Sequence, residues 1–285
     1  MKIGVLGLIV GDLTDVDYNK IRWAAELGFH GVGAHLTVPA DTVSAETVAT
    51  VKSVIADQNI EFLQLWGPYP CLISPDPRIR QAGVAQAREI VKLAARLDVP
   101  GSGVRPTSLN PKGEWWPHPD NFAPETEDRF VESLKEILVT AEEYGINIIL
   151  ETHQTTILNS AQAIRRVIER TDSGRVKVNV DPANFVTDLQ TAFNPAPAIN
   201  ELFDVLELYI DTVHVKDFYL EDRFIVHISE TVIGTGLMDL DTVLRRAQAA
   251  RPDGYVVIEH LPVNLIPLAK RNLDQKIEEL GLPVG

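Results

Sequence analysis

The chain has 285 residues, of which 45% are hydrophobic, and its formal net charge is −14. This acidic balance argues against a nucleic-acid partner, because a sequence-blind binder needs a basic surface. Cys71 is the only cysteine, which excludes an intrachain disulfide and leads us to expect a reducing, cytoplasmic setting. The apolar run at residues 1–10 is too short to span a membrane, so we expect no membrane partner and interpret the run as a strand.

Short apolar runs bounded by turn residues predict strands, and spaced apolar positions between charges predict helices. The predicted strands are Ile3–Leu8, Gly31–Leu36, Ile60–Trp66, Gly101–Arg105, Ile146–Leu150, Val176–Val180, Ile210–Val215 and Tyr255–Ile258. The predicted helices lie near Tyr18–Leu27, Ala45–Gln58, Arg78–Leu97, Thr126–Tyr144, Ala161–Arg170, Pro197–Leu208, Leu240–Ala250 and Leu268–Leu280.

This strict alternation of strand and helix predicts a parallel sheet, and eight repeats favour a closed barrel over a doubly wound sheet. No Gly-x-Gly-x-x-Gly follows the first strand, which disfavours a dinucleotide-binding fold. A (β/α)8 barrel takes roughly 250 residues. We therefore predict an α/β chain folded as a single (β/α)8 TIM barrel domain over residues 1–285.

Four predicted strands in the second half end in a residue type that binds metals. The segments are Ile-Ile-Leu-Glu151, Val-Asn-Val-Asp181, Thr-Val-His214 and Val-Ile-Glu259. Barrel active sites lie where strands end at the C-terminal face, so these groups should converge. Each has an alternative alone: an acid after a strand is often a helix cap, and a lone histidine is often a core residue. Together, however, three carboxylates repel by ~4 kcal/mol per pair at roughly 4 Å, and a divalent cation removes that repulsion.

The order of these residues, with Asp181-Pro-Ala-Asn184, His214-Val-Lys-Asp217 and Ile233-Gly-Thr-Gly236-x-x-Asp239, resembles the xylose isomerase-like superfamily. The nearest branch is that of ketose 3-epimerases and sugar-phosphate-isomerase-like proteins. The resemblance implies one divalent metal held by Glu151, Asp181, His214 and Glu259. Manganese comes first, with Mg²⁺, Co²⁺ or Zn²⁺ as alternatives. It also implies homodimers or homotetramers, between which the composition does not decide.

One position departs from the pattern of several relatives. Asn184 stands where ketose 3-epimerases and endonuclease IV-type nucleases carry a histidine three residues after the aspartate. Asparagine is a poor zinc ligand, so the departure argues against a multinuclear zinc nuclease. It also weakens a strict assignment to the ketose 3-epimerases.

A metal flanked by two glutamates suits proton abstraction next to a carbonyl through an enediolate. The resemblance makes Glu151 and Glu259 both metal ligands and the acid–base pair. We therefore predict a metal-dependent sugar or keto-polyol isomerase or epimerase. The alternative is a lyase or dehydratase acting on a keto-inositol, keto-glycoside or dehydroshikimate-like substrate. A non-catalytic sugar-binding barrel and an endonuclease IV-like nuclease rank lower. The substrate and its phosphorylation stay open.

Further residues near the predicted strand ends are candidates for substrate contact. They are His35, Gln64, Trp66, Arg105, His153, Asn184, Lys216 and Arg223. Most have structural alternatives: a core role for His35, rim packing for Trp66, and an ion pair for Arg105.

Two further predictions concern the loop after the fourth predicted strand and the residue that follows Glu259. Trp115, Trp116 and His118 lie in a long loop that we expect to be a lid over the barrel or simple packing. His260 follows Glu259 directly and should point to the opposite face, so we treat it as structural.

Overall fold

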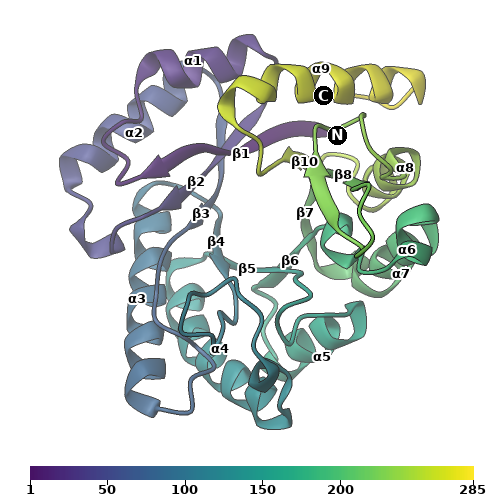
Figure 1. Ribbon diagram of the computed structural model, residues 1–285. Coiled ribbons are helices and arrows are strands. Elements are labelled where there is room, and N and C mark those ends of the chain that lie inside the picture. Colours follow the sequence, from purple (N-terminus) through teal and green to yellow (C-terminus); the bar gives the residue numbers. More distant parts are fainter.

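The computed structural model describes residues 1–285. Eight parallel strands form a closed barrel in the order β1-β10-β7-β6-β5-β4-β3-β2, with helices around it (Figure 1). The barrel strands are β1 Lys2–Gly11, β2 Gly31–Leu36, β3 Glu61–Trp66, β4 Gly101–Val104, β5 Asn147–Glu151, β6 Val176–Val180, β7 Ile210–Val215 and β10 Tyr255–Ile258. The helices are α1 Tyr18–Glu26, α2 Ala45–Asp57, α3 Pro77–Arg96, α4 Pro124–Tyr144, α5 Ala161–Thr171, α6 Leu189–Phe193, α7 Ala196–Leu206, α8 Leu240–Ala250 and α9 Ile266–Glu279.

The barrel closes where the first strand pairs with the last. Lys2 of β1 is in register with Tyr255 of β10, and Val5 with Ile258. The predicted (β/α)8 architecture is therefore confirmed, and the predicted strands agree with the observed ones to within three residues at each end.

Helix boundaries follow from capping groups in the sequence. The side chains of Asp17, Ser44 and Ser160 accept hydrogen bonds from backbone amides in the first turns of α1, α2 and α5. These residues satisfy amides that have no partner within the helix. Helix α4 ends at Gly145, whose φ of 71° is the left-handed conformation that glycine adopts without a Cβ penalty.

Apolar side chains fill two separate layers. A large cluster lies between the strands and the helices, and a small cluster of Leu6, Leu63, Trp66, Ile149 and Val257 lies apart from it. The small cluster comes from strands around the barrel, so it fills the barrel interior. The barrel is therefore a packed core rather than a pore.

A buried polar layer completes the barrel interior. Nε2 of Gln64 donates to Oδ1 of Asn179 at 2.7 Å and reaches Thr212 and Asp211 at 3.1 Å. The register between β6 and β7 shifts here, because Val178 pairs with Ile210 but Asn179 pairs with Thr212. The extra residue in β7 is Asp211, and such a bulge lets neighbouring residues turn toward the same side.

Two features escaped the sequence prediction. An antiparallel hairpin of β8 Asp217–Leu220 and β9 Ile228–Thr231 follows β7, and the short helix α6 precedes α7. At the tip of the hairpin, Phe224, Ile225 and Val226 are exposed. None of the helices has the length and apolar character required to cross a membrane.

Candidate metal centre and active site

Four barrel strands bring the predicted metal ligands together. Glu151 is the last residue of β5, His214 lies near the end of β7, and Asp181 and Glu259 directly follow β6 and β10. One ligand atom from each residue lies within 4.8 Å of the others, and all four side chains are buried. The convergence arises because the carboxyl ends of parallel strands meet at one end of the barrel.

Lys216 joins this cluster from the same face of the chain as His214. Its Nζ lies 2.7 Å from Oδ2 of Asp181 and 2.9 Å from Oε2 of Glu259. Three carboxylates and one ammonium leave a net charge of −2 when all are ionised. A charge of that size in a buried site needs compensation.

Several ligand atoms of the cluster lie in close ionic contacts but lack a well-oriented hydrogen bond. Oδ2 of Asp181, both ring nitrogens of His214 and Oε2 of Glu259 are buried without a well-oriented hydrogen bond. Buried polar atoms are normally hydrogen-bonded, so exceptions call for an explanation. A divalent cation would use these atoms as ligands and neutralise the net charge, so the residues fit a metal. Oxygen and imidazole ligands suit Mg²⁺, Mn²⁺ or Co²⁺.

The two glutamates have oppositely shifted pKa values. Burial, reinforced by the charge of Glu259, raises the pKa of Glu151. Burial also penalises the charged form of Glu259, but Lys216 and His214 hold the pKa of Glu259 well below its ordinary value. Carboxylates whose environments separate their pKa values are suited to acid and base roles.

A cavity of about 490 Å³ lies above the cluster at the barrel mouth. It is lined by Gly7, Val10, His35, Trp115, Glu151, His153, Glu259 and His260. Two of the predicted substrate residues, His35 and His153, therefore lie beside both glutamates. Burial lowers the pKa of His35 to about 4, so its imidazole is neutral at pH 7.

The loop after β4 covers one side of the mouth. The Arg105 guanidinium forms an ion pair with Glu114 at 2.6 Å and lies 4.6 Å from the ring of Trp115. The Trp115 ring in turn lies 5.6 Å from that of His153. Arg105 is thus paired with an acid of the same loop.

Four other predicted substrate residues do not line the mouth cavity. Gln64 is buried in the polar layer of the barrel interior, where Asn179 and Trp66 use its amide. Trp66 is also buried and stacks on His35 at 5.9 Å rather than facing the mouth.

The other two of these residues, Asn184 and Arg223, lie outside the barrel strands. Asn184 donates to the backbone oxygen of Thr152 at 2.9 Å, so its amide is occupied by the chain. Arg223 lies near the exposed hairpin tip, pairs with Glu221 at 2.6 Å and does not line the mouth cavity.

His260 is a functional candidate that sequence reasoning missed. Its backbone has a φ of 62°, which is uncommon for a residue with a side chain. The turn directs the imidazole to the rim of the mouth, where its Nδ1 lies 3.0 Å from Glu230 of β9. The sequence analysis wrongly expected the His260 side chain to point away from the mouth. It assumed that side chains keep alternating between the two faces of the strand, but β10 already ends at Ile258.

Asp217 explains the Gly-x-Gly-x-x-Asp segment. Its carboxylate accepts hydrogen bonds from the backbone amides of Phe218, Gly234, Gly236 and Met238 at 2.8–3.0 Å. A Cβ at Gly236 would lie 2.2 Å from the Phe218 oxygen. Glycine is therefore required for the loop to approach Asp217 and β8 this closely.

Comparison with known proteins places this site in a family. The family model for the xylose isomerase-like TIM barrel matches residues 21–279. The chain belongs to the xylose isomerase-like TIM barrel family. A search of curated protein sequences found no match.

Several solved structures of xylose isomerase-like barrels share the fold over nearly the whole chain. A D-tagatose 3-epimerase-like protein is 21% identical, with a TM-score of 0.76, covering 99% of this chain and 98% of that one. A xylose isomerase-like TIM barrel protein from Mycobacterium smegmatis, in complex with magnesium, is 18% identical, with a TM-score of 0.73 and coverage of 98% and 96%. A probable 3-DHS dehydratase from Bacillus anthracis is 15% identical, with a TM-score of 0.71 and coverage of 96% and 98%.

Proposed function

We propose that this protein is a divalent-metal-dependent sugar or keto-polyol epimerase or isomerase. The observation that carries the proposal is the pair Glu151 and Glu259, which are buried together in the four-residue cluster and both line the cavity at the barrel mouth. Epimerisation needs one group that removes a proton next to a carbonyl and another that supplies a proton. The likeness to a D-tagatose 3-epimerase-like protein supports the same reaction class.

The side chains divide this work by charge. Glu259 is ionised at neutral pH, because Lys216 and His214 stabilise its carboxylate, and it is the proton acceptor. Glu151 lines the same cavity, and we assign it the second proton transfer, on the other face of the substrate carbon. Neutral His35 lines the same cavity and binds a substrate hydroxyl.

Glu151, Asp181, His214 and Glu259 would hold the metal. A bound divalent cation supplies Lewis-acid stabilisation of an enediolate oxygen. Manganese stands first, as the family resemblance implies, and the magnesium in the mycobacterial structure makes Mg²⁺ the first alternative.

A dehydratase is the second candidate, and Lys216 is the observation that favours it. A buried ammonium beside Glu259 can stabilise the negative charge that develops on a departing hydroxyl group. The likeness to a probable 3-DHS dehydratase supports this reaction class. Arg105 argues against an acidic substrate, since Glu114 already neutralises it.

The test combines metal analysis with isotope exchange. Purified protein is analysed for bound metals and then incubated in D₂O with ketoses, keto-inositols and 3-keto-glycosides. We expect about one Mn²⁺, Mg²⁺ or Co²⁺ per chain and deuterium at the carbon next to the carbonyl. Loss of water from the substrate would favour the dehydratase. No exchange with any substrate in the metal-loaded protein would overturn the epimerase proposal.

Two further expectations accompany the proposal. The sugar-processing relatives support a small-molecule substrate, and the homodimer or homotetramer implied by the family resemblance stays a prediction for light scattering to test. The cytoplasmic setting expected from the single cysteine also stays a prediction.

A further inference from the structure

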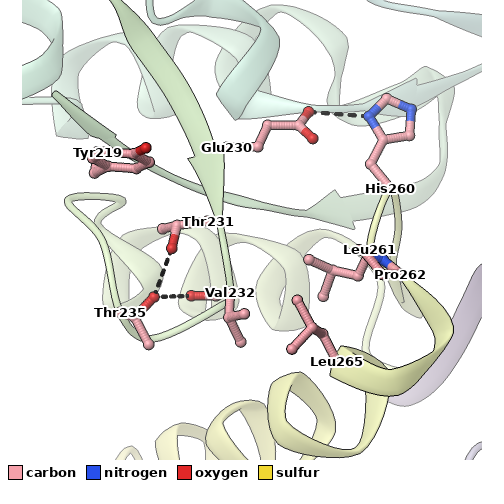
Figure 2. Close-up of a pocket in the computed structure, with 9 residues that line it drawn as sticks. All are labelled: Tyr219, Glu230, Thr231, Val232, Thr235, His260, Leu261, Pro262 and Leu265. Atoms are coloured by element: carbon pink, nitrogen blue, oxygen red, sulfur yellow. Dashed lines mark hydrogen bonds and ion pairs between the residues drawn. The ribbon is translucent and has the colours of Figure 1, made fainter. Parts of the chain in front are cut away.

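A second hollow adjoins the barrel mouth on the side of the β8–β9 hairpin. It is an open groove of about 680 Å³ between the hairpin and the segment that follows β10. Figure 2 shows Tyr219, Glu230, Thr231 and Val232 on the hairpin side, facing Leu261, Pro262 and Leu265. None of the proposed metal ligands lines this groove.

The groove and the mouth cavity meet at one residue. His260 lines both hollows, and its imidazole lies 3.0 Å from Glu230 across the junction (Figure 2). Both side chains are about half exposed, so their polar atoms are accessible from either hollow. A ligand that fills the mouth can therefore continue into the groove beside His260.

The groove is amphipathic. Glu230 and His260 are its only ionisable groups besides the Tyr219 phenol, and their side chains pair with each other. Tyr219 is 43% exposed. An aromatic face, apolar edges and accessible hydroxyls suit a sugar ring or an aryl group, and no basic side chain other than the paired His260 lines the groove to bind an anionic group.

The volumes of the mouth cavity and the groove also favour a ligand longer than a single sugar ring. Ligand sites typically measure about 300–1,000 Å³, so the mouth cavity alone accommodates one small molecule. The groove and mouth together exceed that range. A free monosaccharide would leave the groove empty.

We propose that this groove is a second subsite, which binds the distal part of an elongated, uncharged keto-glycoside while the keto ring lies at Glu151 and Glu259. The distal part is a second sugar ring or an apolar aglycone. The inference rests on the proposed function for the position of the keto ring. It deepens that function by naming a keto-glycoside, rather than a free ketose, as the substrate class.

The test compares short and long ligands that are not turned over. The probes are methyl β-D-glucoside, cellobiose and 4-nitrophenyl β-D-glucoside, titrated into Mg²⁺-loaded protein and followed by ligand-observed NMR. We expect at least one long probe to bind about tenfold more tightly than the methyl glycoside, which corresponds to ~1.4 kcal/mol. Equal affinities for all three probes, or no binding of either long probe, would overturn the subsite.

Two variants change the groove in opposite ways. Val232→Trp fills it, and Tyr219→Ala removes its aromatic wall. In both, the affinity gain of the long probe should fall to about twofold or less. Val139→Trp is the matched control, because Val139 is 64% exposed on the outer helix α4, and it should keep the gain. A gain that survives in both folded groove variants would also reject the proposal.

Isotope exchange separates this inference from the proposed function. Deuterium exchange into free ketoses without any gain for the long probes would leave the function standing and reject the subsite. A gain for the long probes without exchange into any keto compound would support the groove as a binding site and reject the epimerase.

Discussion

The ammonium of Lys216 lies 2.7 Å from Oδ2 of Asp181, and neither side chain is accessible to solvent. Burial penalises the charged form of Lys216, but Asp181 and Glu259 raise the pKa of Lys216 well above its ordinary value. Lys216 therefore stays charged and offsets part of the negative charge of the ligand cluster.

Replacing Lys216 with methionine should destabilise the metal-free protein by roughly 3–5 kcal/mol, because the carboxylates lose their buried partner. Urea unfolding in EDTA measures this loss, and added Mg²⁺ should reduce it. The matched control is Lys52→Met, which breaks an exposed pair with Asp98 and should cost about 1 kcal/mol or less. Equal losses in the two variants would refute the charge-balance argument.

The two glutamates should each be indispensable for turnover. Glu151→Gln and Glu259→Gln keep the side-chain shape but remove the proton-transfer group, so rates should fall by roughly 10²–10⁴-fold. Metal binding should weaken only partly, as amide oxygens still coordinate. Deuterium exchange and metal titration measure the two effects. Glu136→Gln on the outer helix α4 is the control, and near-normal exchange in either site variant would contradict the assignment.

The histidine of the cluster should matter chiefly for metal retention. His214→Ala removes a buried ligand, and affinity should fall by at least about 10–100-fold, the loss seen when even supporting residues are removed. Metal content after dialysis against a weak chelator measures this. His227→Ala, at an exposed position of the hairpin, should retain the metal. Retention of full metal content by the His214 variant would remove it from the ligand set.

The lowered pKa of His35 predicts that this residue makes the folded protein less stable as the pH falls. Because its folded pKa of about 4 lies below its ordinary value of 6.5, the unfolded chain binds a proton first as the pH falls. Stability should therefore decline between pH 6.5 and about 4, by up to ~3 kcal/mol from this residue. Urea unfolding in EDTA across this range should show a steeper decline for the native protein than for His35→Gln. Parallel curves would show that His35 titrates normally.

Asp217 should control local opening of the hairpin. Asp217→Ala leaves four backbone amides without their charged acceptor, so hydrogen exchange at Gly234, Gly236 and Met238 should accelerate by about tenfold or more. The control is Asp239→Ala, which removes only the cap of α8. Unchanged exchange at the three amides would mean that the hairpin is held by other contacts.

Sequence patterns predicted the barrel well because its strands are continuous apolar runs. β6 and β7 begin and end where the pattern placed them, between turn residues. The hairpin β8–β9 was missed, because its two strands are only four residues long and no Asn-Gly turn marks the tip. Apolar patterning detects buried strands, whereas all of β9 is half-buried or exposed and the tip at residues 222–227 is exposed.

The metal cluster was predictable for a related reason, since each ligand directly ends or follows a strand. The sequence could not predict contacts that depend on how far along the barrel axis each inward-facing side chain lies. Alternation indicates that Gln64 faces inward, but only the stagger of the strands shows that it reaches Asn179 on the other side of the barrel. The pairing of Arg105 with Glu114 likewise depends on how the long loop folds back.

Closure of the barrel between β1 and β10 has a consequence for biogenesis. During synthesis β1 emerges early, but Lys2 cannot pair with Tyr255 until the last strand has left the ribosome. Contacts this distant in sequence are costly to form and tend to appear late in folding. Glu259 directly follows the same strand, so a nascent chain gains the proposed proton acceptor only when the barrel closes. A product truncated before β10 would lack both the closing strand and Glu259.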